Sequence, residues 1–127
     1  HYGGWKAAVA GAAVTDWVDQ YDFSDGNVGR ASSIGGSPWV GENMKKYIEQ
    51  SPITEAKNIK APTLILANIG DPRVPVTQSY KLYHTLIDNG TVVKFMGWPI
   101  PAHNATVPIA IMERDRLWLD WMNTYLK

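Results

Sequence analysis

The strongest constraint on the fold of this chain comes from residues 62–75, which read Pro-Thr-Leu-Ile-Leu-Ala-Asn-Ile-Gly-Asp-Pro-Arg-Val-Pro. A short apolar run, typical of a buried strand, leads to Gly70, and the carboxylate of Asp71 follows at once. A helix is expected to begin near Pro75. A buried strand that runs into an acidic residue and then a helix is typical of a parallel sheet, and it places the acid at the carboxyl end of the strand.

The rest of the chain continues this alternation of strand and helix. We expect strands over residues 6–14, 62–67 and 91–98 and helices over residues 42–50, 76–89 and 108–125. Residues 15–41 hold many Gly, Ser, Asp and aromatic residues and are interpreted as a long irregular loop. The predicted fold class is therefore α/β, with about three parallel strands and flanking helices in a single domain over residues 1–127.

The two longer helices each have apolar residues that we expect to be buried. These are Val76, Tyr80, Tyr83 and Ile87 in the first helix and Ile109, Met112, Trp118, Trp121 and Tyr125 in the second. His84, which lies in the middle of the first helix, is expected to be exposed to solvent.

The composition excludes several classes of function. The 127 residues include twelve basic and twelve acidic side chains, so nothing indicates an attraction to nucleic acid or to an anionic membrane. No apolar run approaches the roughly 18 residues that a membrane-spanning helix needs. The absence of cysteine excludes disulfides, thiolate metal sites and a cysteine nucleophile. Neither a cofactor nor a metal site is predicted, and the composition does not decide the compartment.

Two residues able to carry acid–base chemistry follow successive predicted strands. Asp71 comes after the strand over residues 62–67, and His103 comes after the strand over residues 91–98. In open parallel sheets, ligands bind beyond the carboxyl ends of the strands, where both residues are expected to lie. Either residue alone would be assigned to the protein surface. Together, in the order acid then histidine, they match the end of the Ser, Asp, His order of α/β hydrolases that use a catalytic triad.

Several segments resemble a known family. They are residues 62–75, Gln-Ser-Tyr-Lys-Leu-Tyr at 78–83, Asp-Asn-Gly at 88–90, Val-Lys-Phe at 93–95, His103, residues 5–17, Ser-Pro at 51–52 and residues 59–62. In these segments the chain is similar to the C-terminal part of the prolyl oligopeptidase family, and more narrowly to its bacterial dipeptidyl-peptidase and acylaminoacyl-peptidase branch. The resemblance covers essentially the whole chain and implies the C-terminal half of an α/β-hydrolase domain.

The resemblance also implies roles for individual residues. Asp71 matches the acid of the family's catalytic triad and His103 matches its base, so His103 would take the proton of a serine hydroxyl while Asp71 holds the imidazole. The family implies hydrolysis of a peptide or a small ester, without a metal or an organic cofactor. Arg73 is a further candidate for substrate binding, although a salt bridge or a contact at the helix start is the simpler interpretation.

A serine in the sequence context of the family's nucleophile is not found in this chain. The family's serine lies in Gly-x-Ser-x-Gly-Gly between a strand and a helix, whereas only residues 1–4 precede Trp5 here. We interpret residues 1–4 as the remnant after the nucleophile helix; the alternative aligns them with Ser-Tyr-Gly-Gly, with histidine in place of serine. Ser33, in Ala-Ser-Ser-Ile-Gly-Gly at 31–36, is a weak nucleophile candidate because no apolar strand precedes it.

Three functions stay open from the sequence. The chain is a hydrolase fragment that is inactive or very weak alone, or it is half of a split hydrolase whose serine comes from another chain. The third function, from another class, is that of a non-catalytic binding or assembly domain that keeps the hydrolase fold. In each case the strand over residues 6–14 would have an open apolar edge, through which we expect a homo-oligomer to form.

Overall fold

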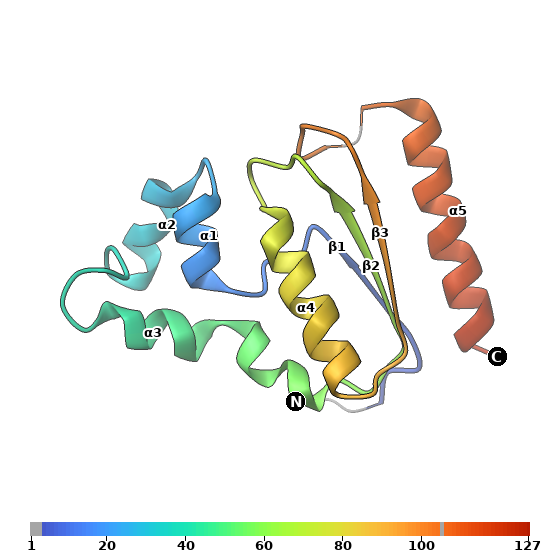
Figure 1. Cartoon of the computed structure of the whole chain (residues 1–127), viewed down its shortest axis with the longest axis horizontal. Coiled ribbons are helices and arrows are strands. Elements are labelled where there is room, and N and C mark those ends of the chain that lie inside the picture. The colour runs from blue at the N-terminus through green and yellow to red at the C-terminus, as the bar shows by residue number, and fades with distance from the viewer. Residues whose placement is uncertain (1–3, 105) are drawn as a thin grey trace.

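The computed structural model describes residues 4–104 and 106–127, and in these residues it contains a parallel sheet flanked by helices (Figure 1). The strands are β1 (Ala8–Gly11), β2 (Thr63–Asn68) and β3 (Val93–Trp98). The helices are α1 (Trp17–Phe23), α2 (Asn27–Ile34), α3 (Asn43–Gln50), α4 (Val76–Asp88) and α5 (Pro108–Tyr125), and Pro52–Asn58 forms a 3₁₀ helix, η1. The strands lie in the order β1-β2-β3, and both pairs are parallel.

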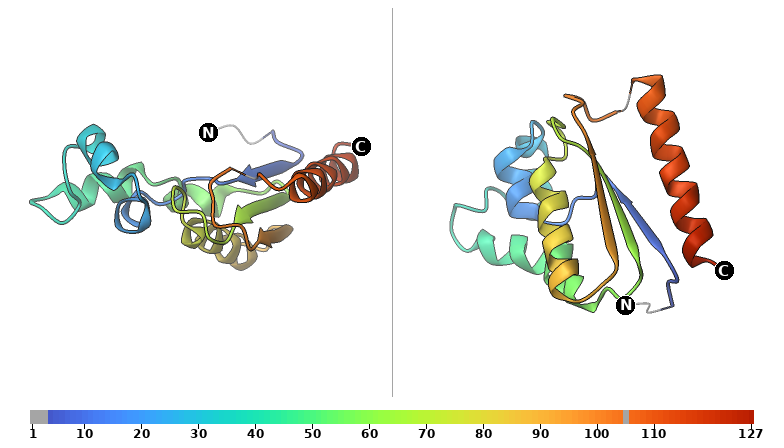
Figure 2. Two further views of the ribbon diagram at one scale, coloured as in Figure 1. Left: turned by 90° about the horizontal axis from the view of Figure 1, so that it is seen from above. Right: turned by 45° about the vertical axis from the view of Figure 1, so that its right-hand side comes forward.

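Strand β2 is the centre of the sheet, and its alternate residues are buried against helices on its two faces. The core cluster on one face joins β2 to α5 and consists of Leu64, Leu66, Trp98, Ile100 and Ala110. The cluster on the other face joins β2 to α4 and η1 and consists of Ala56, Ile65, Leu82 and Leu86. Figure 2 shows α4 and α5 on either side of the strands. The predicted α/β class, with three parallel strands and flanking helices, is therefore confirmed.

The strand predicted over residues 6–14 is too long. Strand β1 covers only Ala8–Gly11, and Ala12 has a φ angle of 47°. A positive φ is uncommon for a residue with a side chain, and it turns the backbone out of the extended conformation. The apolar run of small residues therefore continues past the end of the strand, which sequence pattern alone did not indicate.

The prediction of a long irregular loop over residues 15–41 is wrong, because α1 and α2 lie within it. Asp16 caps α1, and its Oδ1 atom accepts hydrogen bonds from the amides of Val18 at 2.8 Å and Asp19 at 3.2 Å. Helix α2 ends at Gly35, which has a φ angle of 98°. The polar residues and glycines that suggested a loop thus include the residues that begin and end these two short helices.

The predicted buried faces of α4 and α5 are wrong in part. Tyr80 and Ile87 are exposed, and the residues that α4 buries are Gln78, Ser79, Leu82 and Leu86. In α5, Ile109 is 75% exposed and Met112 is 72% exposed, whereas Ala110 is buried against the sheet. Gln78 is buried on α4 because Thr15, Asp16 and Gln20 supply its hydrogen-bond partners, which apolar periodicity does not reveal. His84 is exposed, as predicted.

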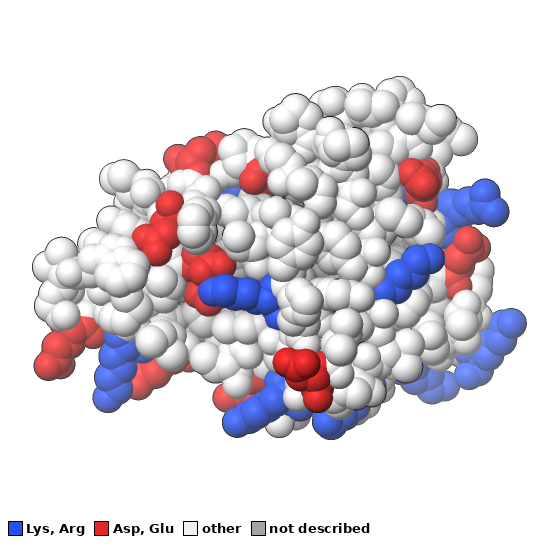
Figure 3. Space-filling model, viewed as in Figure 1, with Lys and Arg blue, Asp and Glu red and all other residues white. Residues whose placement is uncertain are grey.

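Charged side chains of both signs are interspersed over the face of the molecule seen in Figure 3. Among the ion pairs of the described residues, that of Lys45 with Glu49 lies within α3, and that of Lys81 with Asp16 connects different elements. Within the described ranges, no helix combines the length and the apolar composition that crossing a bilayer requires.

Lys81 of α4 connects this helix to α1. Its ammonium group donates to Asp16 Oδ2 at 2.7 Å and to Asp19 Oδ1 at 2.6 Å. Burial alone would raise the pKa of Asp16, but the hydrogen bonds from Lys81 and from the amides of α1 outweigh it and hold that pKa below its ordinary value of 3.8. Burial likewise opposes the charge on Lys81, but the two carboxylates raise its pKa above the ordinary 10.5. Asp16 and Lys81 are therefore both charged throughout the neutral range.

Replacing Lys81 with Met should weaken this connection in a way that depends on pH. We expect the free energy of unfolding at neutral pH to fall by about 1 kcal/mol, because partly exposed ion pairs contribute little. Since the folded state lowers the pKa of Asp16, the contribution of this residue is present above 3.8 and is lost as pH falls through the folded value. The free energy of unfolding of Lys81→Met, measured with urea, should therefore come closer to that of the wild type as pH falls from neutral to about 3.

The matched control for this measurement is Lys45→Met, which removes an exposed pair with Glu49. We expect its free energy of unfolding to stay close to that of the wild type at both pH values. If the loss of unfolding free energy in Lys81→Met is the same at neutral and acidic pH, the role given to the carboxylates is contradicted.

The outer edge of β1 carries backbone groups that have no partner among the described residues. Ala8 and Ala12 donate their amides to backbone oxygens on the β2 side, so the alternate residues Val9 and Gly11 direct their N–H and C=O groups away from it. An unpaired, apolar edge of this kind can pair with another strand. The homo-oligomer expected from the sequence stays a prediction, and the structure locates the edge that it would use.

Two substitutions at Gly11 test this edge. A Cβ atom added at Gly11 meets nothing within 4 Å, so alanine fits there, whereas proline also removes the outward N–H group. We expect the wild type and Gly11→Ala to associate at high concentration in sedimentation velocity runs, and Gly11→Pro to sediment as a monomer. A monomeric wild type, or association that persists in Gly11→Pro, would contradict pairing through β1.

Candidate active site

The two loops that follow β2 and β3 run side by side at the carboxyl edge of the sheet. The amide of Ile69 donates to the carbonyl of Trp98 at 2.8 Å. The amide of Gly70 donates to the carbonyl of Ile100 at 3.2 Å, so the pairing of the strands continues into the loops. Glycine is needed for this approach, because a Cβ atom at position 70 would lie 2.9 Å from Cα of Pro101.

This approach brings together the two residues that the sequence singled out. The Oδ2 atom of Asp71 lies 2.8 Å from Nδ1 of His103. The other oxygen, Oδ1, accepts hydrogen bonds from the amides of Arg73 at 2.7 Å and Val74 at 3.0 Å. The Asp71 side chain is 2% exposed, and the His103 side chain is 41% exposed. A buried carboxylate, held by its own loop, therefore orients an imidazole that solvent can reach.

Asn68 supports the loop that carries the histidine, and sequence reasoning missed it. Its Nδ2 atom donates to the carbonyl of Ala102 at 2.7 Å and to that of His103 at 3.3 Å. Asn68 is the last residue of β2, three positions before Asp71. A polar residue that ends an otherwise apolar buried strand was the signal that could have identified it, because such a side chain needs a hydrogen-bond partner nearby.

A cavity of about 510 Å³ opens beside the pair. Asp71 and His103 line it together with Asn68, Trp98 and Arg114 of α5. Within residues 4–104 and 106–127, no group of three or more His, Cys, Asp or Glu side chains is arranged to hold a metal ion.

The remaining residues predicted for the site are placed elsewhere. The guanidinium of Arg73 is engaged by Asp25, with Nε 2.6 Å from Oδ1, which is the salt bridge of the simpler interpretation. Ser33 is an exposed residue in the last turn of α2, and this helix lies beyond α1 as seen from the loop that follows β3 (Figure 1). Residues 1–3, with the alternative that aligns His1 with a nucleophile, lie outside the described residues.

Three parallel strands with flanking helices define the class of α/β proteins, and this chain adds a carboxylate–histidine pair at the carboxyl edge of its sheet. Within this class, the chain belongs to the prolyl oligopeptidase family, whose family model matches residues 2–127. Among solved structures, it is similar to the acylaminoacyl peptidase of Pyrococcus horikoshii, with a TM-score of 0.85 and 31% identity. Among curated proteins, it is 29% identical over 86 residues to the acylamino-acid-releasing enzyme of Arabidopsis thaliana. It is also 29% identical over 105 residues to the uncharacterized peptidase YuxL of Bacillus subtilis (strain 168).

The chain corresponds to only a part of each of these relatives. The match with the Pyrococcus horikoshii structure covers 97% of this chain and 20% of that one. The match with the Arabidopsis thaliana enzyme covers 68% of this chain and 11% of that protein, and the match with YuxL covers 79% and 15%. The resemblance stated from the sequence is thus confirmed, and the structure is that of a fragment of the α/β-hydrolase fold.

The close approach of the two loops predicts the effect of a single added methyl group. In Gly70→Ala, the new Cβ atom meets backbone atoms of Pro101 and Ile100, which cannot move independently of their loop. We expect the free energy of unfolding in urea to fall by about 1–3 kcal/mol, as overpacked sites do. The hydrogen bond between Asp71 and His103 should weaken as well, which the ring ¹⁵N resonances of His103 report.

Gly29→Ala is the matched control for this substitution. Gly29 lies in α2, is exposed, and has nothing within 4 Å of an added Cβ atom. Alanine favours a helix more than glycine does, so this variant should be as stable as the wild type or slightly more stable. Equal stability of the two alanine variants would show that the loops tolerate the added atom, contrary to this prediction.

Proposed function

We propose that this chain supplies the acid and the base of a serine-peptidase-type site, and that the reaction is the hydrolysis of peptide bonds. The observation that carries the proposal is the 2.8 Å contact between Asp71 Oδ2 and His103 Nδ1. One nitrogen of the imidazole is held by a buried carboxylate, which leaves Nε2 to exchange protons with a reacting group.

In the proposed reaction, Nε2 of His103 accepts the proton of a serine hydroxyl as the serine oxygen attacks the substrate carbonyl. Asp71 keeps the proton of the imidazole on Nδ1 and stabilises the imidazolium that forms. The imidazolium then gives its Nε2 proton to the leaving amine, and an acyl-enzyme remains. A water molecule repeats the sequence, with His103 again acting first as base and then as acid, and this step releases the free carboxylic acid.

The serine of this reaction is proposed to come from outside the described residues. The sequence contains no Gly-x-Ser-x-Gly motif, and the chain spans 20% of the Pyrococcus horikoshii structure that it matches. A serine on another segment or on another chain would satisfy the proposal equally. Without it, the chain should be inactive or very weak, because loss of the nucleophile costs about 10⁶ in rate.

Peptides are favoured over simple esters as the substrate class by the names of the relatives. Two of them are called an acylaminoacyl peptidase and an acylamino-acid-releasing enzyme, and a solved relative was bound to a peptide chloromethyl ketone. We therefore propose a peptide with a blocked amino terminus as the substrate. An ester would be hydrolysed by the same chemistry, since both reactions transfer an acyl group through the same intermediate.

A chimaera provides the test. The segment of the Pyrococcus horikoshii acylaminoacyl peptidase that this chain matches is replaced by this chain, so that the enzyme's own remainder supplies the nucleophile. We expect the chimaera to hydrolyse an N-acetyl-amino-acid p-nitroanilide. His103→Ala should reduce kcat by about 10⁴-fold or more, and Asp71→Asn should reduce it by about 10⁴-fold. His84→Ala, which alters an exposed histidine of α4, is the matched control and should leave the rate unchanged.

The chain alone is assayed beside the chimaera with a p-nitrophenyl ester. No activity above background is expected. Activity that disappears in His103→Ala would mean that the chain contains its own nucleophile, and Ser33→Ala would then tell whether Ser33 is that residue. A chimaera that folds but keeps its rate in His103→Ala would refute the proposed role of the pair, and a non-catalytic binding domain would become the better interpretation.

A further inference from the structure

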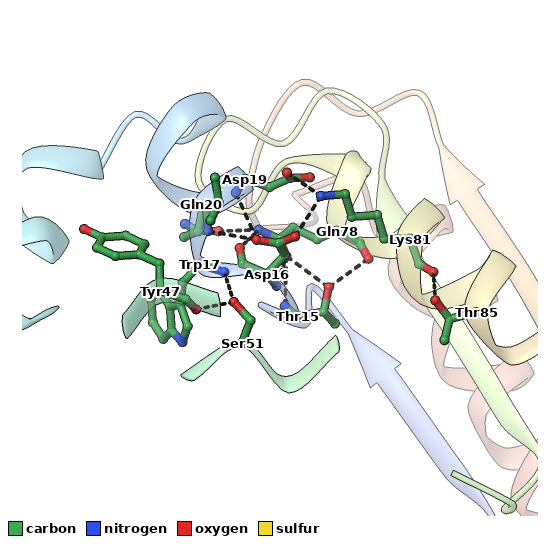
Figure 4. Close-up of polar contacts among 11 residues, drawn as sticks. Thr15, Asp16, Trp17, Asp19, Gln20, Tyr47, Ser51, Gln78, Lys81 and Thr85 are labelled. Atoms are coloured by element: carbon green, nitrogen blue, oxygen red, sulfur yellow. Dashed lines mark hydrogen bonds and ion pairs between the residues drawn. The ribbon is translucent and has the colours of Figure 1, made fainter. Parts of the chain in front are cut away.

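Helix α1 is connected to α4 by a buried glutamine, Gln78 (Figure 4). This side chain is 0% exposed. Its Oε1 atom accepts hydrogen bonds from the amides of Thr15 at 2.8 Å and Asp16 at 2.7 Å, and its Nε2 atom donates to the carbonyl of Asp16 at 2.8 Å. Gln78 therefore binds the backbone at the start of α1, and these contacts fix where the helix begins relative to α4.

A second buried glutamine extends this connection towards the acid. Gln20 of α1 is 1% exposed, and its Oε1 atom accepts a hydrogen bond from Nε2 of Gln78 at 3.3 Å. Its own Nε2 atom donates to the carbonyl of Arg73 at 2.7 Å. The same carbonyl accepts a second hydrogen bond, from the hydroxyl of Ser24 at 2.8 Å. A side chain of α1 and the side chain of the residue that follows α1 thus hold one carbonyl of the loop that carries Asp71.

The backbone of this loop is what orients the carboxylate. The amide of Arg73, the residue whose carbonyl α1 holds, donates to Oδ1 of Asp71. The amide of Asp25, just beyond α1, donates to the carbonyl of Pro72 at 2.8 Å, on the same loop. The contacts therefore form a continuous path from Gln78 through Gln20 and Arg73 to Asp71, whose second oxygen meets His103.

The chemistry of Gln20 points to positioning rather than to packing alone. Burial of an amide costs free energy unless the amide is hydrogen-bonded, and an apolar side chain of similar size would fill the same space without that cost. What an apolar side chain cannot provide is the donor to the Arg73 carbonyl. A buried side chain whose two polar atoms are used to connect α4 with the acid loop is suited to fixing the position of that loop.

We infer that Gln20 is a positioning residue for the acid–base pair, which acts by holding the Arg73 carbonyl so that Asp71 meets Nδ1 of His103. The inference rests on the proposed function, because positioning matters for catalysis only if Asp71 and His103 act as the acid and the base. According to this inference, α1 holds the loop that carries Asp71 in place, and it does so through the Arg73 carbonyl rather than through Asp71 or His103.

The test uses the full chain and the variant Gln20→Met, which keeps the size of the side chain and removes both polar atoms. Two readouts are measured by NMR: amide hydrogen exchange at Arg73 and Val74, whose N–H groups donate to Asp71, and the tautomer of the neutral His103 ring from its ¹⁵N resonances. We expect exchange at Arg73 and Val74 to be about fivefold to tenfold faster, the factor that loss of one ordinary hydrogen bond gives. The share of the Nδ1–H tautomer should fall, because a displaced carboxylate no longer holds that proton.

Two further variants keep the test decisive. Ser24→Ala removes the other donor to the Arg73 carbonyl and should cause the same two changes, so the proposal can be judged even if Gln20→Met fails to fold. Asn89→Leu is the matched control. Asn89 directly follows the C-terminal end of α4, and its side-chain amide donates to the carbonyl of Ala56. In this control, exchange at Arg73 and Val74 and the tautomer of His103 should match the wild type.

The outcomes separate this inference from the proposed function. Unchanged exchange and an unchanged tautomer in Gln20→Met and Ser24→Ala would overturn it. Equal acceleration at amides throughout the sheet, including Ile65 of β2, would also overturn it, since that result indicates a loss of general stability only. If the wild-type His103 carries no proton on Nδ1, the proposed acid–base pair fails, while exchange at Arg73 and Val74 still decides whether α1 holds the loop.

Discussion

The register between β2 and β3 is the constraint on which the rest of this structure depends. The two strands pair in parallel from Thr63 opposite Val93 to Asn68 opposite Trp98, so both end at the same level. Since parallel strands present their carboxyl ends at one edge of the sheet, the loops that follow them begin side by side. A slip of one residue would reverse the faces of β2 and would also misalign the acid with the histidine. The core and the candidate site are therefore determined by the same pairing.

The central features of the fold could be predicted from the sequence because they rest on strong local patterns. The apolar run that forms β2 is bounded by Pro62 and Gly70 and is best explained as a buried strand. The predicted bounds of the last helix, residues 108–125, are those of α5. The approach of Asp71 and His103 followed from topology rather than from any contact, because strand ends in a parallel sheet meet at one edge. The resemblance to the prolyl oligopeptidase family added the roles of the two residues.

What could not be predicted depends on partners that are distant in the sequence. Helix α1 lies in residues 15–41, whose many Gly, Ser, Asp and aromatic residues predict a loop. Its capping residue, Asp16, and its buried Gln20 have partners more than 50 residues away, before and on α4, which this composition does not reveal. The buried face of α4 was misassigned for the same reason, since Gln78 is buried by hydrogen bonding rather than by apolar packing. Periodicity of apolar residues reports hydrophobic burial, and it carries no information about polar side chains whose burial requires a specific partner.

The different exposure of the acid and the histidine has a physical cause. A carboxyl group can be buried at low cost only when its oxygens have hydrogen-bond partners, and Asp71 receives two amides on one oxygen and contacts the imidazole with the other. The histidine must be accessible on its second nitrogen if it is to exchange a proton with a reacting group, and its side chain remains partly exposed. The remaining contacts lie on the far side of the acid loop, where Gln20 of α1 donates to the Arg73 carbonyl, and beside the histidine, where Asn68 donates to the Ala102 carbonyl. The imidazole therefore stays partly exposed while Asp71 holds its Nδ1 atom and Asn68 holds the backbone of its loop.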